Sequence, residues 1–185
     1  MKKRNVLFLI FVCCFASLFY IFFIKQKKDI EDFIFYTGEN KENNYIVCIK
    51  NRQEDIIFYE EYAREPTVKV VYDDTFMVIR GQGDWHGYTF INIETSLVSE
   101  EFDDINAWNH EKVVYSVYEN DVIKIVIQDI YDKEKYYKEV LRNYAPEAIP
   151  YRVILDAEFI NDSQVILKYY RGEEWEEVSE IIDLN

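Results

Sequence analysis

Apolar and polar side chains alternate in short runs along most of the chain after residue 28, as they do in β-strands that have one solvated face. The alternation is clearest in the runs that begin at Val68 (VKVVYD), Val122 (VIKIVIQ) and Val165 (VILKYY). Clusters rich in Asn and Asp lie between such runs, for example NRQED from Asn51 and NDSQ from Asn161. Asn and Asp favour turns because their short side chains hydrogen-bond to nearby backbone groups. The pattern predicts roughly a dozen short strands and no long helix after residue 28.

Three segments repeat one pattern, in which a strand ends in an acidic or amide-rich turn and a second strand returns. The centres of these turns, Asp74, Asp121 and Asp162, are 47 and 41 residues apart. This spacing is similar to the repeat of β-propeller blades, about 40–50 residues, although no blade signature dipeptide is present. An antiparallel meander, a sandwich or a curled sheet explains the same hairpins. We therefore predict an all-β domain of antiparallel hairpins and meanders, with a sandwich, a curled sheet and a partial propeller as open alternatives.

The first 28 residues have a different character from the rest of the chain. From Val6 to Ile24 no residue is charged, and Lys and Arg flank this run on both sides. Such a run is long enough for a transmembrane helix of about 20 residues. Its apolar residues continue past the small residues Cys14, Ala16 and Ser17, where a signal peptidase would cut. An uncleaved transmembrane signal-anchor over residues 1–28 is therefore favoured over a cleaved signal peptide.

The charges that flank the apolar run do not fix its orientation. Three basic residues lie on each side, so the positive-inside rule gives no preference. A short basic tail ahead of a first span is typically cytoplasmic. We therefore expect a single-pass membrane protein that crosses the bilayer through residues 6–24 and carries residues 29–185 on the extracytoplasmic side.

Residues 29–185 form one predicted domain that is strongly acidic. All 35 acidic residues of the chain lie there, against 15 basic residues, which gives a formal charge of −20. Nucleic-acid binding needs a basic surface, so the charge excludes that class of partner. The charge suits a basic protein partner, or it serves only to keep the domain soluble. Cys48 is the single cysteine of this domain and therefore has no disulfide partner within it.

The stretch GQGDWHGY, residues 81–88, holds three of the five glycines of the chain. It lies between two strand-like runs, and its glycines predict that GQGDWHG is the loop of a long hairpin. A phosphate-binding loop would need a lysine and a following helix, and neither is present. Asp84 and His86, with Asp103 and His110 nearby in sequence, are the residues that could bind a metal, although their spacing matches no zinc class. Because that spacing is not typical of a metal site, we predict that the protein binds no metal and no other cofactor, and the sequence identifies no catalytic residue.

The tryptophans Trp85, Trp108 and Trp175, together with His86 and His110, are the candidate binding residues. Exposed tryptophans are favoured at interfaces because each ring buries a large area at little entropic cost. The alternative is that these rings pack against the faces of the sheets.

An apolar anchor, one acidic domain and no catalytic signature favour a binding role without catalysis. We expect a membrane-anchored extracytoplasmic binding domain that captures a basic protein partner, as an immunity or inhibitor protein does. One alternative is a metal-dependent enzyme of the cell envelope that uses the region of Asp84, His86 and His110. The other is an accessory subunit of an envelope assembly.

Overall fold

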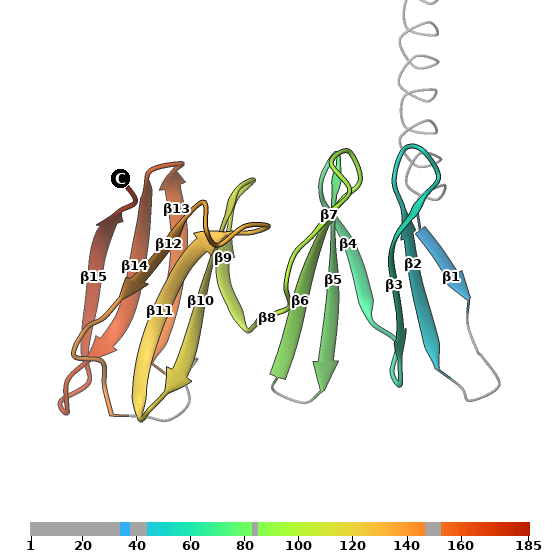
Figure 1. Ribbon diagram of the computed structural model, residues 1–185. Helices are drawn as coiled ribbons and strands as arrows, with labels where there is room; N and C mark the ends of the chain where they lie inside the picture. The colour runs from blue at the N-terminus through green and yellow to red at the C-terminus, as the bar shows by residue number, and fades with distance from the viewer. Residues whose placement is uncertain (1–33, 38–43, 83–84, 147–152) are drawn as a thin grey trace, which may run out of the picture. The chain divides into compact units, whose positions relative to one another are not determined.

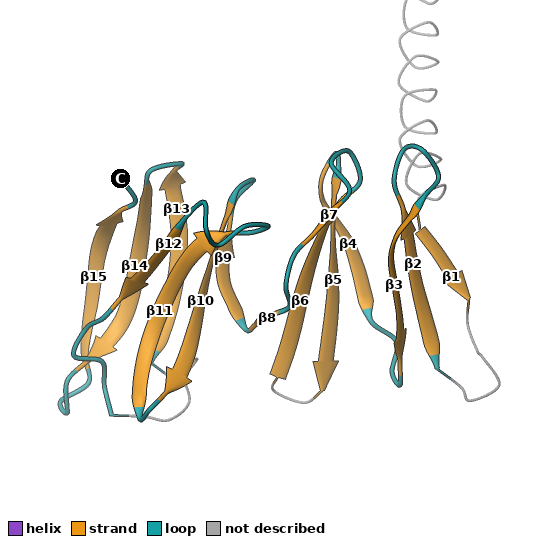
Figure 2. Cartoon of the chain, in the orientation of Figure 1, coloured by secondary structure: helices purple, strands orange, loops and turns teal. Residues whose placement is uncertain are grey.

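The computed structural model describes residues 34–37, 44–82, 85–146 and 153–185. Within these ranges the chain consists of β-strands and the turns between them, and it contains no helix (Figure 2). The all-β prediction is therefore confirmed for this part of the chain. The predicted signal-anchor over residues 1–28 lies outside the described residues. The described ranges contain no helix that is long and apolar enough to span a bilayer.

The described residues form fifteen strands, and several of these strands are short. The alternation of the sequence predicts fewer, because it gives little signal for a strand of two residues. The strands are β1 (Ile34–Thr37), β2 (Tyr45–Lys50), β3 (Ile56–Tyr62), β4 (Thr67–Tyr72), β5 (Thr75–Gln82), β6 (Trp85–Asn92), β7 (Leu97–Val98), β8 (Phe102–Asp103), β9 (Ile105–Trp108), β10 (Lys112–Glu119), β11 (Val122–Asp129), β12 (Tyr137–Val140), β13 (Ile154–Asn161), β14 (Gln164–Arg171) and β15 (Glu176–Asp183).

The described strands form four antiparallel sheets, each built from strands that follow one another along the chain (Figure 1). The first sheet has the order β1-β2-β3 and the second has the order β4-β5-β6-β7, with β8 also paired to β6. The third sheet has the order β12-β11-β10-β9 and the fourth has the order β13-β14-β15. The runs that begin at Val68, Val122 and Val165 lie in β4, β11 and β14. The prediction of antiparallel hairpins and meanders is therefore confirmed.

The chain divides into two compact units, residues 1–63 and residues 64–185. The first unit contains the first sheet, and the second unit contains the other three sheets. One domain over residues 29–185 stays a prediction.

The turn between β2 and β3 in the first unit is organised by Asn51. Its side-chain oxygen Oδ1 accepts hydrogen bonds from the backbone N–H groups of Gln53 and Asp55, at 3.0 and 2.9 Å. This is the kind of turn that the NRQED cluster predicts. It brings β3 back alongside β2, in which Val47 and Ile49 are fully buried.

The core of the second unit lies on both faces of the third sheet. Strands β10 and β11 have nearly continuous apolar sequences, which is typical of strands that are buried on both faces. Val113 and Val114 are adjacent in β10 and fully buried, and adjacent side chains of a strand point to opposite faces. Val113 belongs to a cluster shared with the second sheet, and Val114 belongs to a cluster shared with the fourth sheet. The third sheet is thus the middle layer of this unit.

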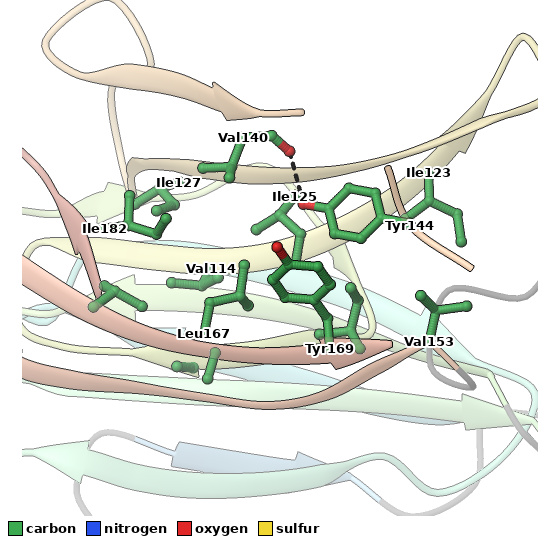
Figure 3. Packing of buried hydrophobic residues seen from close by; sticks show 14 of the residues in the cluster. Val114, Ile123, Ile125, Ile127, Val140, Tyr144, Val153, Leu167, Tyr169 and Ile182 are labelled. Atoms are coloured by element: carbon green, nitrogen blue, oxygen red, sulfur yellow. Dashed lines mark hydrogen bonds between the residues drawn. The ribbon is translucent and has the colours of Figure 1, made fainter. Parts of the chain in front are cut away.

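The cluster between the third and fourth sheets is the larger of these two (Figure 3). The hydroxyl of Tyr144 donates a hydrogen bond of 2.9 Å to the backbone oxygen of Val140, so its polar atom is satisfied inside the cluster. The ring of Tyr144 meets the ring of Tyr169 edge to face, with centroids 5.1 Å apart. Leu167 and Ile182 reach the same cluster from β14 and β15. One face of the fourth sheet is therefore buried in the core.

Asparagine and left-handed backbone angles close the turns of the second unit. The Oδ1 atom of Asn92 accepts hydrogen bonds from the N–H groups of Glu94 and Thr95, at 3.0 and 2.8 Å. Between β10 and β11, Asn120 and Asp121 have φ angles of 51° and 63°. Both central residues of a tight hairpin turn of this kind need positive φ, which Asn and Asp tolerate. The predicted turn at Asp121 is confirmed.

Candidate functional site

The glycine-rich stretch forms the end of the β5–β6 hairpin, and its ladder extends further than the sequence predicts. Gly81 pairs with His86, and Gln82 pairs with Trp85. The hairpin prediction is therefore correct, but most of GQGDWHG belongs to strands, so its predicted loop is too long. The rule that glycines indicate loops fails here, because two regularly paired antiparallel strands can contain glycine. Asp84 lies outside the described residues.

His86 is held against Asp104 by two hydrogen bonds, each donated by a backbone N–H group. The N–H of His86 donates to Asp104 Oδ1 at 3.1 Å, and the N–H of Asp104 donates to the carbonyl of His86 at 2.9 Å. The imidazole Nδ1 lies 3.8 Å from Asp104 Oδ1, and both side chains are partly exposed. Asp104 takes this position because the pairing of β8 with β6 ends at Asp103, and the chain then turns with a φ of 42°. The sequence shows no signal that distinguishes Asp104 from Asp103.

The pKa of Asp104 is raised, chiefly by burial. The hydrogen bond from the His86 backbone and the imidazole of His86 act in the opposite direction, and the neighbouring carboxylate of Asp103 raises the pKa further. The residues described here include no group of three or more His, Cys, Asp or Glu side chains that could hold a metal ion.

His110 lies at the other end of the second sheet. Its ring stacks on Tyr72, with centroids 3.7 Å apart. Tyr72 ends β4 and pairs with Thr75, which pairs in turn with Asn92 at the far end of β6 from His86. Six strand residues span roughly 20 Å. The structure therefore does not bring the two histidines together.

The described tryptophan side chains lie on different sheets. Trp108 ends β9 in the third sheet, and its ring centroid lies 6.4 Å from that of Phe90 in β6. Trp175 lies in the turn between β14 and β15, with its ring centroid 5.5 Å from that of Tyr170. Both are more than one-third exposed. Trp85 belongs to β6, and its side chain lies outside what the structure describes. Trp108 and Trp175 therefore form no common platform.

The fourth sheet presents a second face that sequence reasoning missed. The alternate positions of β14, Val165, Leu167 and Tyr169, are buried in the core, so the positions between them face outward. Across the outward face, Ile166 pairs with Ile181. Ile181 is 57% exposed. The sequence gives little indication of this face, because Ile181 is the one apolar residue among the outward positions of β15.

Acidic side chains surround this outward face. Lys168 pairs with Asp156 at 3.1 Å, and Arg171 pairs with Glu176 at 2.6 Å. Further glutamates at positions 158, 173, 174 and 177 form no ion pair among the described residues. The fourth sheet and its β14–β15 turn therefore carry a net negative charge at neutral pH.

A hollow of about 520 Å³ opens beside the β10–β11 turn. Three of its polar lining residues, Tyr118, Asp121 and Arg142, form contacts with other side chains. The hydroxyl of Tyr118 donates to Asp121 at 3.2 Å, and the guanidinium of Arg142 is held by Glu180 at 2.7 Å. The volume would suit a small molecule, but these three polar side chains are already used in contacts within the protein.

Comparisons with protein-family models, with curated proteins and with solved structures found no match to this chain.

Proposed function

We propose that this protein is a binding protein that captures a basic protein partner, in the manner of an inhibitor or immunity protein. The observation that carries the proposal is the negative charge of residues 29–185, which contain 35 acidic and 15 basic residues. Such a charge attracts a basic partner over several ångströms and raises the rate of association.

The proposal includes a membrane anchor through residues 6–24, with residues 29–185 on the extracytoplasmic side. The uncharged apolar run and its basic flanks support this placement. A tether of this kind would concentrate the binding surface where a protein that arrives from outside must pass.

Binding is favoured over catalysis by the positions of the histidines. His86 and His110 lie at opposite ends of the second sheet, so they cannot serve one reacting centre. The close neighbours of His110 and Trp108 that the structure gives are aromatic rings, which support packing roles for both.

The test is affinity capture with the full-length chain, purified in a non-ionic detergent and immobilised. Membrane extracts and culture medium are applied at about 50 mM and at about 500 mM salt, because screening weakens interactions between exposed charges. We expect one stoichiometric partner with a basic surface, retained at low salt and released at high salt. An acidic partner, or a basic partner held equally well at both salt concentrations, would contradict the proposal.

The His86–Asp104 contact favours a second candidate function, a metal-dependent enzyme of the cell envelope. Binding of a metal to the folded state would raise the melting temperature. Zinc, manganese and calcium are therefore added in turn to the chain and to the His86→Ala variant. A rise for the unaltered chain that is absent in the variant supports a metal site, and no rise with any of the three ions excludes it.

A further inference from the structure

We propose that the outward face of the fourth sheet is the surface that receives the basic partner. This surface, called the outer face below, comprises the outward positions of β13, β14 and β15 and the β14–β15 turn. The inference rests on the proposed function and assigns it to a place on the molecule. It also states the chemistry of the contact, in which lysine and arginine side chains lie along an apolar strip and reach carboxylates at its border.

The apolar strip is formed where the sheet departs from regular alternation. The register of β13 against β14 shifts between Ile154 and Asp156 and again between Phe159 and Asn161. The residues within the two shifts are Leu155 and Ile160, which are 42% and 46% exposed. An extra residue in one strand redirects side chains locally.

Two isoleucines and an aromatic pair complete the strip. Ile166 pairs with Ile181 across β14 and β15, and Tyr170 pairs with Glu177 four positions further along the same strands, beyond the outward pair of Lys168 and Ser179. Trp175 is 40% exposed and lies against Tyr170. Exposed apolar side chains that share one face with charged and polar residues are typical of protein interaction surfaces.

The carboxylates around the apolar strip favour a partner with a basic surface. Glu158 and Glu177 belong to β13 and β15, and Glu173 and Glu174 belong to the β14–β15 turn. None of the four forms an ion pair among the described residues. A basic partner would neutralise them, whereas a second copy of this chain would place like charges against each other.

Lysine and arginine match both parts of the outer face. Their aliphatic stems pack on apolar surface while the charged ends reach polar groups. A stem on Ile166 would bring its cation to Glu158, which pairs with Ile166 in the neighbouring strand, and a second basic side chain would reach Glu177. The face of a tryptophan ring also attracts a cation, which gives Trp175 a direct role.

The backbone of Trp175 supports a role for its side chain. Its φ is 55°, in the left-handed region where a bulky residue is strained and where Gly or Asn is the usual choice. A strained residue of this kind is retained where the surrounding structure or a function requires it. The N–H of Trp175 donates to the carbonyl of Gly172 at 3.2 Å, so this backbone conformation closes the turn. It also places the ring, which is 40% exposed beside Tyr170, where a partner can contact it.

The test uses an acetylated octalysine peptide as the probe and the full-length chain in non-ionic detergent at low salt. Glu177→Lys and Ile181→Ser alter the outer face. Glu134→Lys is the matched control for charge, because Glu134 is an exposed residue between β11 and β12 in the third sheet, and Leu97→Ser is the matched apolar control in the second sheet. All four side chains are exposed, and circular dichroism checks that each variant keeps its sheet content.

We expect Glu177→Lys to weaken octalysine binding by about tenfold and Ile181→Ser by about threefold, with each control within about twofold of the unaltered chain. Equal weakening by Glu177→Lys and Glu134→Lys would show that the peptide senses only the total charge. That result would overturn the assignment of the outer face and leave the proposed function standing. If the unaltered chain does not bind octalysine, the proposed function and this inference both fail.

Discussion

Val113 and Val114 give a direct measure of how the third sheet is packed. The two residues are adjacent in β10 and are both 0% exposed, but they belong to clusters on opposite faces of the sheet. Substitution by alanine removes two buried carbon groups, a loss of about 1.6 kcal/mol at about 0.8 kcal/mol for each group. The cavity that remains raises the expected cost to roughly 2–3 kcal/mol for Val113→Ala and the same for Val114→Ala.

The assay is urea unfolding of the full-length chain, followed by far-ultraviolet circular dichroism. Because the two side chains belong to different clusters, we expect the double variant to lose more than either single variant, about 4–6 kcal/mol if the two losses add. Val122→Ala is the control, since Val122 starts β11 and is 46% exposed, and we expect it to change the free energy of unfolding by less than about 0.5 kcal/mol. A loss below about 0.5 kcal/mol for either buried valine would refute the conclusion that both faces of the third sheet are covered.

Three further predictions follow from the second unit. Burial raises the pKa of Tyr131 to about 12 from the ordinary value of 10.0, so between these pH values the folded state keeps a proton that the unfolded chain loses. The contribution of Tyr131 to stability should therefore be complete below pH 10 and be lost as the pH rises to 12, and a Tyr131→Phe variant that loses stability over this range as steeply as the unaltered chain would contradict this. Gly172→Ala should cost about 1 kcal/mol, because φ is +65°, and an added Cβ would meet only Asn143 Nδ2 at 3.6 Å, so an unchanged melting temperature would exclude a backbone cost. Asn92→Ala should cost roughly 1–2 kcal/mol, because it removes the acceptor for two backbone N–H groups, and thermal unfolding at the same pH measures the loss.

Local pattern predicts much of this fold because most strands pair with a neighbour along the chain, and several of these pairs are joined by short turns. The alternation from Val68, Val122 and Val165 identifies three strands. The turn at Asp121 is predicted by residues that tolerate positive φ, and the structure has that backbone conformation. The loop predicted from the glycines is too long, because glycine permits unusual backbone angles without requiring them.

The candidate site is harder to predict from the sequence, because it depends on contacts between residues that are far apart in the chain. The stack of His110 on Tyr72 joins residues that are far apart in the chain and that no local period connects. The outer face is a further example. Whether Ile166 or Leu167 faces the core depends on where the third sheet lies, and alternation alone states only that the two face opposite ways.

The sequential order of the strands has a consequence for biosynthesis. Chains are made from the N-terminus, so the third sheet is complete before any strand of the fourth sheet has been translated. In that interval Val114, Ile125 and Ile127 present an uncovered apolar face, because the residues that bury them come from β13, β14 and β15. A nascent chain that stalls after β12 would therefore be a substrate for chaperones or proteases. Residues 154–183, which form β13, β14 and β15, complete the cluster on that face of the third sheet.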